Sequence, residues 1–476
     1  MKPDQLRRTR TAAGVGAAVL AMSASQAFAS AFALQEQSGS GLGNAFAGGA
    51  AAAQDASTVY TNPAGMALLP GMQIVGSGTS IHPSAKFHDD GSVAAAFQPL
   101  GGTGGDAGGA GLTGALLPAG YFAMPLNSQW WIGVGANTPF GLKTEYDSDW
   151  LGRFQAVKSE VKTVNVNPAA SYRINDMVTL GVGINWQRID ATLDSHINYA
   201  AAFAQGVQQG VAAGKIPAAA APVLINSAAG LESQADITGD DTAWGWNIGA
   251  LFQLDQATRI GVAYRSKIKY TVNGNADFNH PTTLGALPPT LAPVGAAIAA
   301  GVNAALFNGP VTLALEVPDS ANISFFKQLD SRWDVMADVQ YTGWSSVQEL
   351  RIVRDTGVTL AVTPENFRDT WRASVGANYH WTPEWMFRGG IAYDQSPVRD
   401  AERTPRLPDG DRTWFSFGVQ YRFSPQFVVD GGYTYISVKD PSINQNAGST
   451  AANGLINGTY KSNVNIGSIQ VTYTFN

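Results

Sequence analysis

Residues 244–270 read WGWNIGALFQLDQATRIGVAYRSKIKY. In the first ten residues of this stretch, apolar side chains occupy every second position, and the positions between them are mostly small or polar. Successive side chains of a β-strand point to opposite faces, so one face of this segment meets an apolar medium and the other a polar one. The turn formers Asp255-Gln256 then separate this run from the next. The stretch therefore predicts a β-hairpin.

The second run of the hairpin extends the same pattern. Its polar face carries Arg265, Lys267 and Lys269, and its apolar face carries Ile260, Val262, Tyr264, Ile268 and Tyr270. Later runs of similar length alternate in the same way, at residues 333–341, 371–379, 415–421 and 469–475. A repeated two-faced strand is the building block of a large antiparallel sheet.

The breaks between runs are of two kinds that take turns along the chain. The short breaks are Asn127-Ser128, Asn175-Asp176, Asp255-Gln256, Asp330-Ser331, Thr382-Pro383-Glu384 and Ser424-Pro425. The long breaks fall near 82–118, 138–159, 194–241, 273–319, 349–369, 394–412 and 438–463. These thirteen breaks separate fourteen strands. Short turns on one side and long loops on the other predict an all-β fold, a 14-stranded antiparallel transmembrane β-barrel over residues 73–476.

Composition supports a barrel that faces lipid outside and water inside. Charged residues make up only 14%, while the chain has 53 Gly and 10% aromatic residues. A soluble β-sandwich is the alternative, but it would not need aromatic residues at both ends of nearly every strand. The net charge of -6 argues against a nucleic-acid partner. No Cys is present, which excludes disulfides and Cys-bound metals, and we expect no cofactor and no metal.

The first 29 residues have the features of an export signal. Lys2 and three arginines form a basic region, Ala12 to Met22 a short apolar core, and Ala27-Phe28-Ala29 a small-x-small cleavage site. We expect cleavage after Ala29, which leaves Ser30 as the first mature residue. The pair Arg7-Arg8 could indicate twin-arginine export, but barrels must be exported unfolded.

Residues 30–72 lack the alternation of the rest of the chain. They contain a Gly- and Ala-rich stretch, Gly39 to Ala53, and then Asn62-Pro63-Ala64. This composition is too apolar for a solvated tail. A fourteen-stranded barrel also has a lumen wide enough to need filling. We therefore predict that residues 30–72 form an N-terminal hatch, a plug inside the lumen.

At this point the sequence resembles the FadL family of outer-membrane transporters for long-chain fatty acids and hydrocarbons, which also includes OmpP1 and TodX. The similar motifs, in this order over nearly the whole mature chain, are Ser30 to Glu36, Ser40 to Gly43, Asn62-Pro63-Ala64, Asp149 to Phe154, Asn165 to Pro168, Asp338 to Trp344 and Arg403 to Asp409 with Asp411-Arg412. The family fold is a fourteen-stranded barrel with an N-terminal hatch, in agreement with the count above.

The resemblance implies roles for particular residues. Phe32 and Leu34 would reach into a hydrophobic ligand pocket, although Phe32 could instead be an ordinary anchor of the plug. Asn62, Pro63 and Ala64 would shape the hatch, and a purely structural turn is the alternative for them.

A Gly/Pro cluster marks the third predicted strand. Gly133, Gly135 and Pro139 would weaken or bend it, because Pro cannot donate to the ladder and Gly has no side chain to pack. In the family, ligand leaves through a lateral gap beside a kinked strand, so these residues would form a lateral gate. The alternative is a strand that simply ends at Pro139.

Two apolar segments in the long loops, residues 200–230 and 284–306, predict helical elements on the extracellular side. They could cap the barrel or, as the resemblance implies, capture ligand first. We expect energy-independent facilitated diffusion of a long-chain fatty acid or similar hydrophobic molecule through the outer membrane. Uptake of a monoaromatic hydrocarbon such as toluene remains an alternative, as does a general porin or an adhesin.

Other expectations concern chemistry and partners. The five His residues show no catalytic spacing, so we expect no enzyme activity. Arg265, Lys267, Lys269 and Arg372 are among the polar-face cations that could meet a carboxylate head group, but none is singled out. The expected partners besides the ligand are outer-membrane lipid, lipopolysaccharide and the barrel assembly machinery, and the resemblance implies a monomer.

Overall fold

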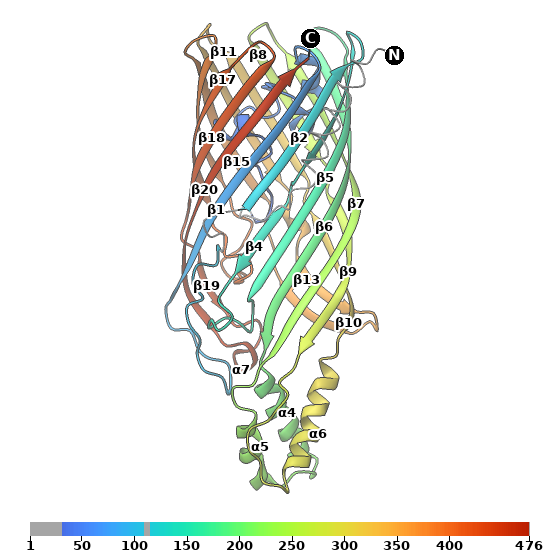
Figure 1. The fold of residues 1–476 in the computed structure, drawn as a ribbon, viewed down its shortest axis with the longest axis vertical. Helices are drawn as coiled ribbons and strands as arrows, with labels where there is room; N and C mark the ends of the chain where they lie inside the picture. Colours follow the sequence, from blue (N-terminus) through green and yellow to red (C-terminus); the bar gives the residue numbers. More distant parts are fainter. Residues whose placement is uncertain (1–30, 109–114, 476) are drawn as a thin grey trace, which may run out of the picture.

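The computed structural model describes residues 31–108 and 115–475, and the predicted signal peptide and Ser30 lie outside this part. The described strands form one closed antiparallel sheet, closed where β1 pairs with β20 (Figure 1). The barrel strands in chain order, several of them interrupted, are β1 (Gln73–Asp89), β2 (Ala115–Pro125), β3 with β4 (Trp130–Asn137, Gly141–Glu145), β5 (Lys158–Arg173), β6 (Val178–Ile197), β7 (Ser233–Gln253), β8 with β9 (Thr258–Arg265, Ile268–Asn279), β10 with β11 (Gly309–Val317, Ser320–Gln328), β12 with β13 (Trp333–Thr342, Glu349–Arg354), β14 with β15 (Thr359–Pro364, Thr370–His380), β16 (Trp385–Asp394), β17 (Arg412–Arg422), β18 with β19 (Phe427–Val438, Ser442–Gln445) and β20 (Ile456–Thr474). The predicted fourteen-stranded antiparallel barrel is confirmed.

The two ends of the barrel differ as the sequence predicted. Each predicted short break joins two strands that pair as a hairpin, for example β7 and β8 around residues 254–257. The short turns share one end with the C-terminus, and the long loops with their helices gather at the other end (Figure 1). Long loops mark the extracellular side of an outer-membrane barrel, and short turns mark the periplasmic side.

The long breaks are shorter in the structure than predicted. The predicted loop 194–241 is wrong at both ends, because β6 runs to Ile197 and β7 begins at Ser233. Likewise, β9 and β10 extend into the predicted loop 273–319. These strands continue beyond the lipid-facing band toward the extracellular side. Their outer face is polar there, so the apolar alternation used for the prediction no longer marks them as strands.

The outer face of the barrel carries the large apolar side chains of the alternating runs. Trp244 is 68% exposed, Trp371 54%, Phe417 56% and Ile469 66%. Such a band of exposed aliphatic and aromatic side chains suits a lipid environment. The predicted outward direction of these faces is confirmed.

One predicted face is wrong. Ile268 and Tyr270 are buried inside the barrel, whereas Lys267 and Lys269 point outward and form ion pairs with Glu316. The cause is the interruption between β8 and β9, which shifts the alternation by one residue, so that Arg265 and Ile268 face the same side. A shift of one residue exchanges the two faces of a strand.

The next barrel strand shifts in the same way. Pro318-Asp319 separates β10 from β11, and both Val317 before the break and Ser324 after it face inward. As a result, these two barrel strands have an apolar inward face on the extracellular side of their interruptions. On the periplasmic side of the interruptions their inward face is polar.

Residues 31–72 lie against the inner wall of the barrel near the periplasmic end (Figure 1). They contain three short helices, α2 (Gly39–Leu42), α3 (Thr58–Thr61) and η1 (Pro63–Leu68). Inward-facing glycines of the strands lie close to the backbone of residues 31–72. A Cβ on Gly261 would lie 1.9 Å from the Ala50 carbonyl oxygen, and one on Gly390 would lie 2.3 Å from the Asn44 backbone. Part of the high glycine content therefore allows this segment to approach the wall.

The predicted helical elements of the long loops are present. They are α4 (Tyr199–Ala212), η2 (Ala218–Ala220), α5 (Ala221–Ser227) and α6 (Ala292–Ala305), while η3 (Trp344–Ser346) and α7 (Thr450–Asn453) are single turns. Phe203 and Leu224 are fully buried where α4 and α5 pack with partly buried residues of α6. None of the helices in the described ranges has both the length and the apolar character needed to cross a membrane.

Candidate functional site

The extracellular half of the lumen is lined by an apolar surface. Its inward side chains come mainly from β6, β7, β9, β10 and β13, because the alternation on these strands turns apolar residues inward. We call this set the lumen cluster: Ile189, Ala235, Ile268, Tyr270, Val272, Ala276, Val311, Leu313, Leu315, Val317 and Ile352. A crevice of about 20 Å³ opens between Leu193, Val272, Val311 and Ile352. A surface of this kind holds apolar molecules by removing their area from water.

Phe32 closes the lumen cluster on the periplasmic side. It is 7% exposed, and its ring centroid lies 4.7 Å from that of Trp344 and 5.8 Å from that of Phe140. The edge-on and tilted arrangements are those that aromatic pairs favour. The N-terminal segment thus contributes an aromatic side chain to the surface that a ligand would meet.

The backbone around Phe32 fills the interruption of the third barrel strand. The Leu34 amide donates to the Pro139 carbonyl at 2.8 Å, and the Gly141 amide donates to the Phe32 carbonyl at 2.8 Å. Ala33 and Phe140 form an antiparallel bridge. Phe32 to Leu34 therefore pairs like a short strand with the residues that separate β3 from β4. The structure thus brings Phe32 and Leu34, predicted to contact ligand, next to Pro139, predicted to interrupt the third strand.

Gly133 and Gly135 lie in the regular part of β3, where the strand pairs with both neighbours. A Cβ on Gly133 would lie 2.7 Å from Met66 and Val59, and one on Gly135 would lie 2.9 Å from the Tyr121 ring. Gly133 thus makes room for α3 and η1, and Gly135 makes room for the Tyr121 ring, whereas the interruption itself falls after Asn137. The lateral gate assigned to them stays a prediction.

Asn62, Pro63 and Ala64 begin η1. The Asn62 side chain accepts from the Ala64 amide at 3.0 Å and donates to the carbonyls of Ala50 at 2.8 Å and Ala250 at 3.1 Å. Pro63 occupies the first position of the helix, where its missing N–H costs nothing. Asn62 therefore caps the helix and also ties residues 31–72 to β7.

Two further contacts fasten the segment to the wall. Gln470 of β20 accepts from the Gly39 amide at 2.9 Å and donates to Asp55 at 2.8 Å. At the start of the segment, the Ala31 amide donates to Asp409, which also pairs with Arg412. The first residues are thus held by Asp409, by the pairing with Pro139 and by the packing of the Phe32 ring.

Glu36 stands out within the segment because it is buried without a partner. It is 2% exposed, and neither carboxylate oxygen has a hydrogen-bond partner in another described residue. Burial raises the pKa of Glu36 to about 7, against the opposing effect of Arg412 and Arg372. Its charge state therefore changes near neutral pH.

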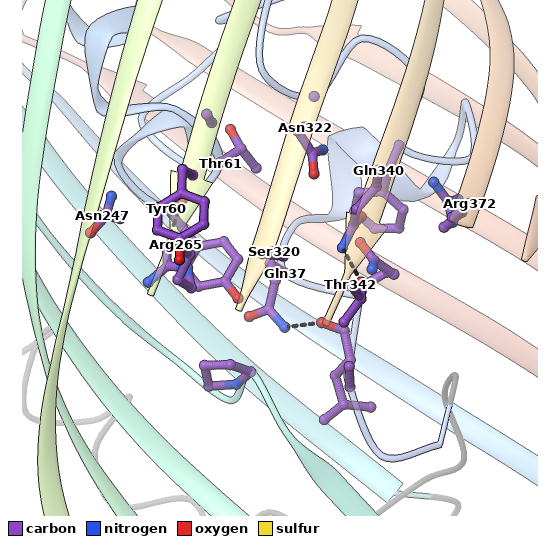
Figure 2. A pocket seen from close by; sticks show the side chains of 18 of the residues that line it. Gln37, Tyr60, Thr61, Asn247, Arg265, Ser320, Asn322, Gln340, Thr342 and Arg372 are labelled. Carbon is purple, nitrogen blue, oxygen red and sulfur yellow. Dashed lines mark hydrogen bonds between the residues drawn. The ribbon is translucent and has the colours of Figure 1, made fainter. Parts of the chain in front are cut away.

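A cavity of about 100 Å³, lined by both polar and apolar side chains, adjoins Leu34 and Phe140 (Figure 2). Arg265 lies over the Tyr60 ring at 3.9 Å and donates to the Tyr60 carbonyl at 2.8 Å. Arg372 donates to the Ala45 carbonyl at 2.7 Å. Two of the four cations named from the sequence, Arg265 and Arg372, therefore hold residues 31–72. The remaining labelled side chains in this view are Gln37, Thr61, Asn247, Ser320, Asn322, Gln340 and Thr342.

The sequence reasoning missed the residues of the lumen cluster on β10, since it placed them in a loop. Their alternation, Val311, Leu313, Leu315 and Val317, is visible in the sequence and would have indicated a strand. Among residues 31–108 and 115–475, no group of three His, Asp or Glu side chains is arranged to hold a metal ion.

A closed barrel with an exposed apolar band, long loops at one end and an apolar inner surface defines an outer-membrane transport protein for apolar molecules. The comparison with known families narrows this class. The chain belongs to the family described as outer membrane protein transport protein (OMPP1/FadL/TodX), whose model matches residues 20–475. The expected family and the expected outer-membrane location are confirmed.

Individual relatives are similar over most of their length. A long-chain fatty acid transport protein of Escherichia coli O6:H1 is 31% identical over 413 residues, 86% of this chain and 87% of that protein. Outer membrane protein P1 of Haemophilus influenzae is 30% identical over 449 residues, 91% of this chain and 93% of that protein. A FadL homologue of Pseudomonas aeruginosa has a TM-score of 0.80 at 26% identity, covering 94% of this chain and 100% of that chain. The toluene transporter TodX of Pseudomonas putida shares the fold, with a TM-score of 0.62 at 19% identity over 88% of this chain and 94% of that chain.

Proposed function

We propose that this protein takes up long-chain fatty acids, or similar hydrophobic molecules, through the outer membrane by energy-independent facilitated diffusion. The observation that carries the proposal is the lumen cluster, an apolar surface inside a barrel that ends on Phe32. Each methylene moved from water to apolar surroundings gains about 0.8 kcal/mol, so a chain of about sixteen carbons gains roughly 12 kcal/mol. A water-filled pore offers no such gain.

The path begins outside the membrane. The apolar helices α4, α5 and α6 offer a first surface for the ligand, and the lumen cluster offers the next one. Phe32 and Leu34 then contact the ligand at the end of the cluster. Because a tight site must also release its ligand, the segment that carries Phe32 has to move for transport to proceed.

Residues 31–72 act as a hatch in this proposal, with Asn62, Pro63 and Ala64 as its structural turn. Their burial and their contacts with inward glycines support a closed lumen rather than an open pore. When Phe32 to Leu34 leave Pro139 to Gly141, the interruption between β3 and β4 loses its pairing partner. Ligand would then leave sideways at Pro139, beside the strand that holds Gly133 and Gly135.

The rival cargo within transport is a monoaromatic hydrocarbon, and the rivals outside it are a general porin, an adhesin and an enzyme. Assembly by the barrel assembly machinery, contact with lipopolysaccharide and a monomeric state belong to the proposal as well. A single set of measurements separates these functions. Purified protein in mild detergent is titrated with labelled oleate and labelled toluene, and proteoliposomes are tested for swelling in sugar solutions.

The expected result is saturable oleate binding, weaker toluene binding and no sugar-driven swelling. Rapid swelling would identify a porin, and hydrolysis of added lipid would identify an enzyme. Absence of saturable oleate binding by folded protein would overturn the proposed function.

A further inference from the structure

Arg354 is a buried cation in the apolar half of the lumen. It is the last residue of β13 and is 4% exposed. Its two terminal nitrogens, Nη1 and Nη2, are buried and have no hydrogen-bond partner among the described residues. A buried guanidinium that no other group neutralises is costly, so a protein rarely retains one without a use for it.

The neighbours of this guanidinium are aromatic. It lies 3.9 Å from the ring centroid of Phe307, just beyond α6, and 5.7 Å from that of Phe278 on β9. These contacts stabilise the charge in part, yet they satisfy none of its N–H groups. The backbone is fixed as well, because the Arg354 amide donates to the Val358 carbonyl at 2.8 Å in the turn between β13 and β14.

The carboxylates near this strand are engaged elsewhere or point away. Glu349 pairs with Arg351 on the outer face, and Glu316 pairs with two outward lysines. Asp355 follows Arg354 directly but is exposed. No ion pair forms to Arg354 within residues 31–108 and 115–475.

The position of Arg354 connects it to the lumen cluster. It pairs with Val311 across β10 and β13, and Ile352 lies two residues before it on the same inward face. Val311 and Ile352 both line the crevice of about 20 Å³. From Val311 the inward apolar side chains of β10 continue to Val317, which at about 3.3 Å per residue covers roughly 20 Å.

We propose that Arg354 forms an anion subsite at the extracellular entrance of the lumen cluster, which receives the carboxylate of a fatty acid whose tail runs along β10 toward Phe32. This inference rests on the proposed function and makes it more specific. Two parallel N–H···O bonds to one carboxylate would satisfy both unpartnered nitrogens. A neutral hydrocarbon leaves both unsatisfied, so the subsite favours fatty acids over toluene-like cargo.

The test separates charge recognition from general packing. Binding of oleate and of its neutral methyl ester is measured by intrinsic Trp fluorescence for the wild type and for Arg354→Met, which keeps an unbranched apolar side chain like the stem of Arg but removes the charge. Arg354→Met should weaken oleate binding about tenfold or more, the effect of one charge-assisted hydrogen bond. Binding of methyl oleate should be unchanged. Arg354→Lys should retain part of the preference for oleate.

Arg351→Met is the matched control, because Arg351 lies on the same strand but points outward and pairs with Glu349. It should leave both ligands unaffected. Heat-modifiable migration on gels shows whether each variant has formed the barrel. Equal loss of oleate and ester binding in Arg354→Met, or no loss of either, overturns the subsite while the proposed function stands. If the folded wild type binds neither ligand, the proposed function fails and the subsite fails with it.

Discussion

The two halves of the lumen are built from the same strands but have opposite interiors. On the extracellular side the inward residues are apolar, such as Val272 and Leu313. On the periplasmic side they are polar or glycine, such as Asp338 and Gly390, and residues 31–72 cover them. The outer face does not follow the inner one. Its apolar, lipid-facing band surrounds the half of the lumen that is polar inside, and Trp246 and Phe417 are exposed there.

The difference teaches that a transport barrel can set its interior independently of its exterior. The alternation shifts by one residue at Ser266-Lys267 and at Pro318-Asp319. Apolar side chains therefore face lipid on the periplasmic side of these positions and face the lumen on the extracellular side. An apolar inner surface therefore adjoins residues 31–72. Substitutions in the two halves of the lumen should therefore have different effects.

The largest effect is expected in the polar half, from Gly390→Val. The new side chain would overlap the Asn44 backbone, which cannot move without the rest of the segment. Residues 31–72 should therefore fail to seat, and proteoliposomes containing the variant should swell in sugar solutions at least about tenfold faster than those with wild type. The rate of swelling measures this directly.

Gly389→Val is the matched control, since a Cβ on Gly389 meets nothing within 4 Å. It should behave as wild type. A Gly390→Val barrel that forms normally and stays closed to sugars would show that close seating of the segment does not seal the lumen.

The next effect concerns pH and Glu36. Its folded-state pKa of about 7 exceeds the ordinary value of 4.5, so the folded state favours the protonated acid. Stability from this group is full below pH 4.5, falls as the pH rises to about 7, and stays low above that. This increase in the pKa corresponds to roughly 3 kcal/mol. The charges of Arg412 and Arg372 lower the pKa of Glu36, and that of Asp394 raises it.

Glu36→Gln should remove this pH dependence. Thermal unfolding of wild type in detergent, followed by circular dichroism, should occur at a lower temperature at pH 8 than at pH 5. The variant should differ less between the two pH values and exceed wild type at pH 8. Glu384→Gln, an exposed carboxyl in a short turn, serves as the control. Identical profiles for Glu36→Gln and wild type would refute the role of its charge.

The fold could be predicted from the sequence because it depends on local signals. Period-two alternation and the turn formers, for example Asp255-Gln256 and Asp330-Ser331, determine where strands start and stop. The candidate site depends on pairing between distant segments. Nothing local indicates that Phe32 pairs with Gly141, that Gly390 meets Asn44, or that the terminal guanidinium nitrogens of Arg354 have no hydrogen-bond partner among the described residues. Lys267 was assigned to the wrong face because a one-residue shift is invisible in a continuous run.

The third prediction tests the apolar half. Leu313→Asn places an amide in the lumen cluster, where Leu313 is 8% exposed. Loss of apolar contact and burial of an unsatisfied polar group should weaken oleate binding about tenfold. Ala314→Asn, the neighbouring position that points outward, should have no effect. Titration with labelled oleate distinguishes the two, and equal affinities would place the ligand outside the lumen cluster.

The smallest effect is expected where the two halves meet, from Phe32→Ala. The ring touches only the end of the lumen cluster, so its loss should remove contacts worth about one or two methylenes, roughly fivefold in affinity. The barrel should remain heat-modifiable on gels, because the strands do not depend on this ring. Phe417→Ala, which truncates an exposed aromatic on the lipid face, is the matched control. Since Phe32 also packs on Trp344 and Phe140, oleate affinity equal to wild type would leave it only the role of an anchor for residues 31–72, and the ligand surface would then end on β10.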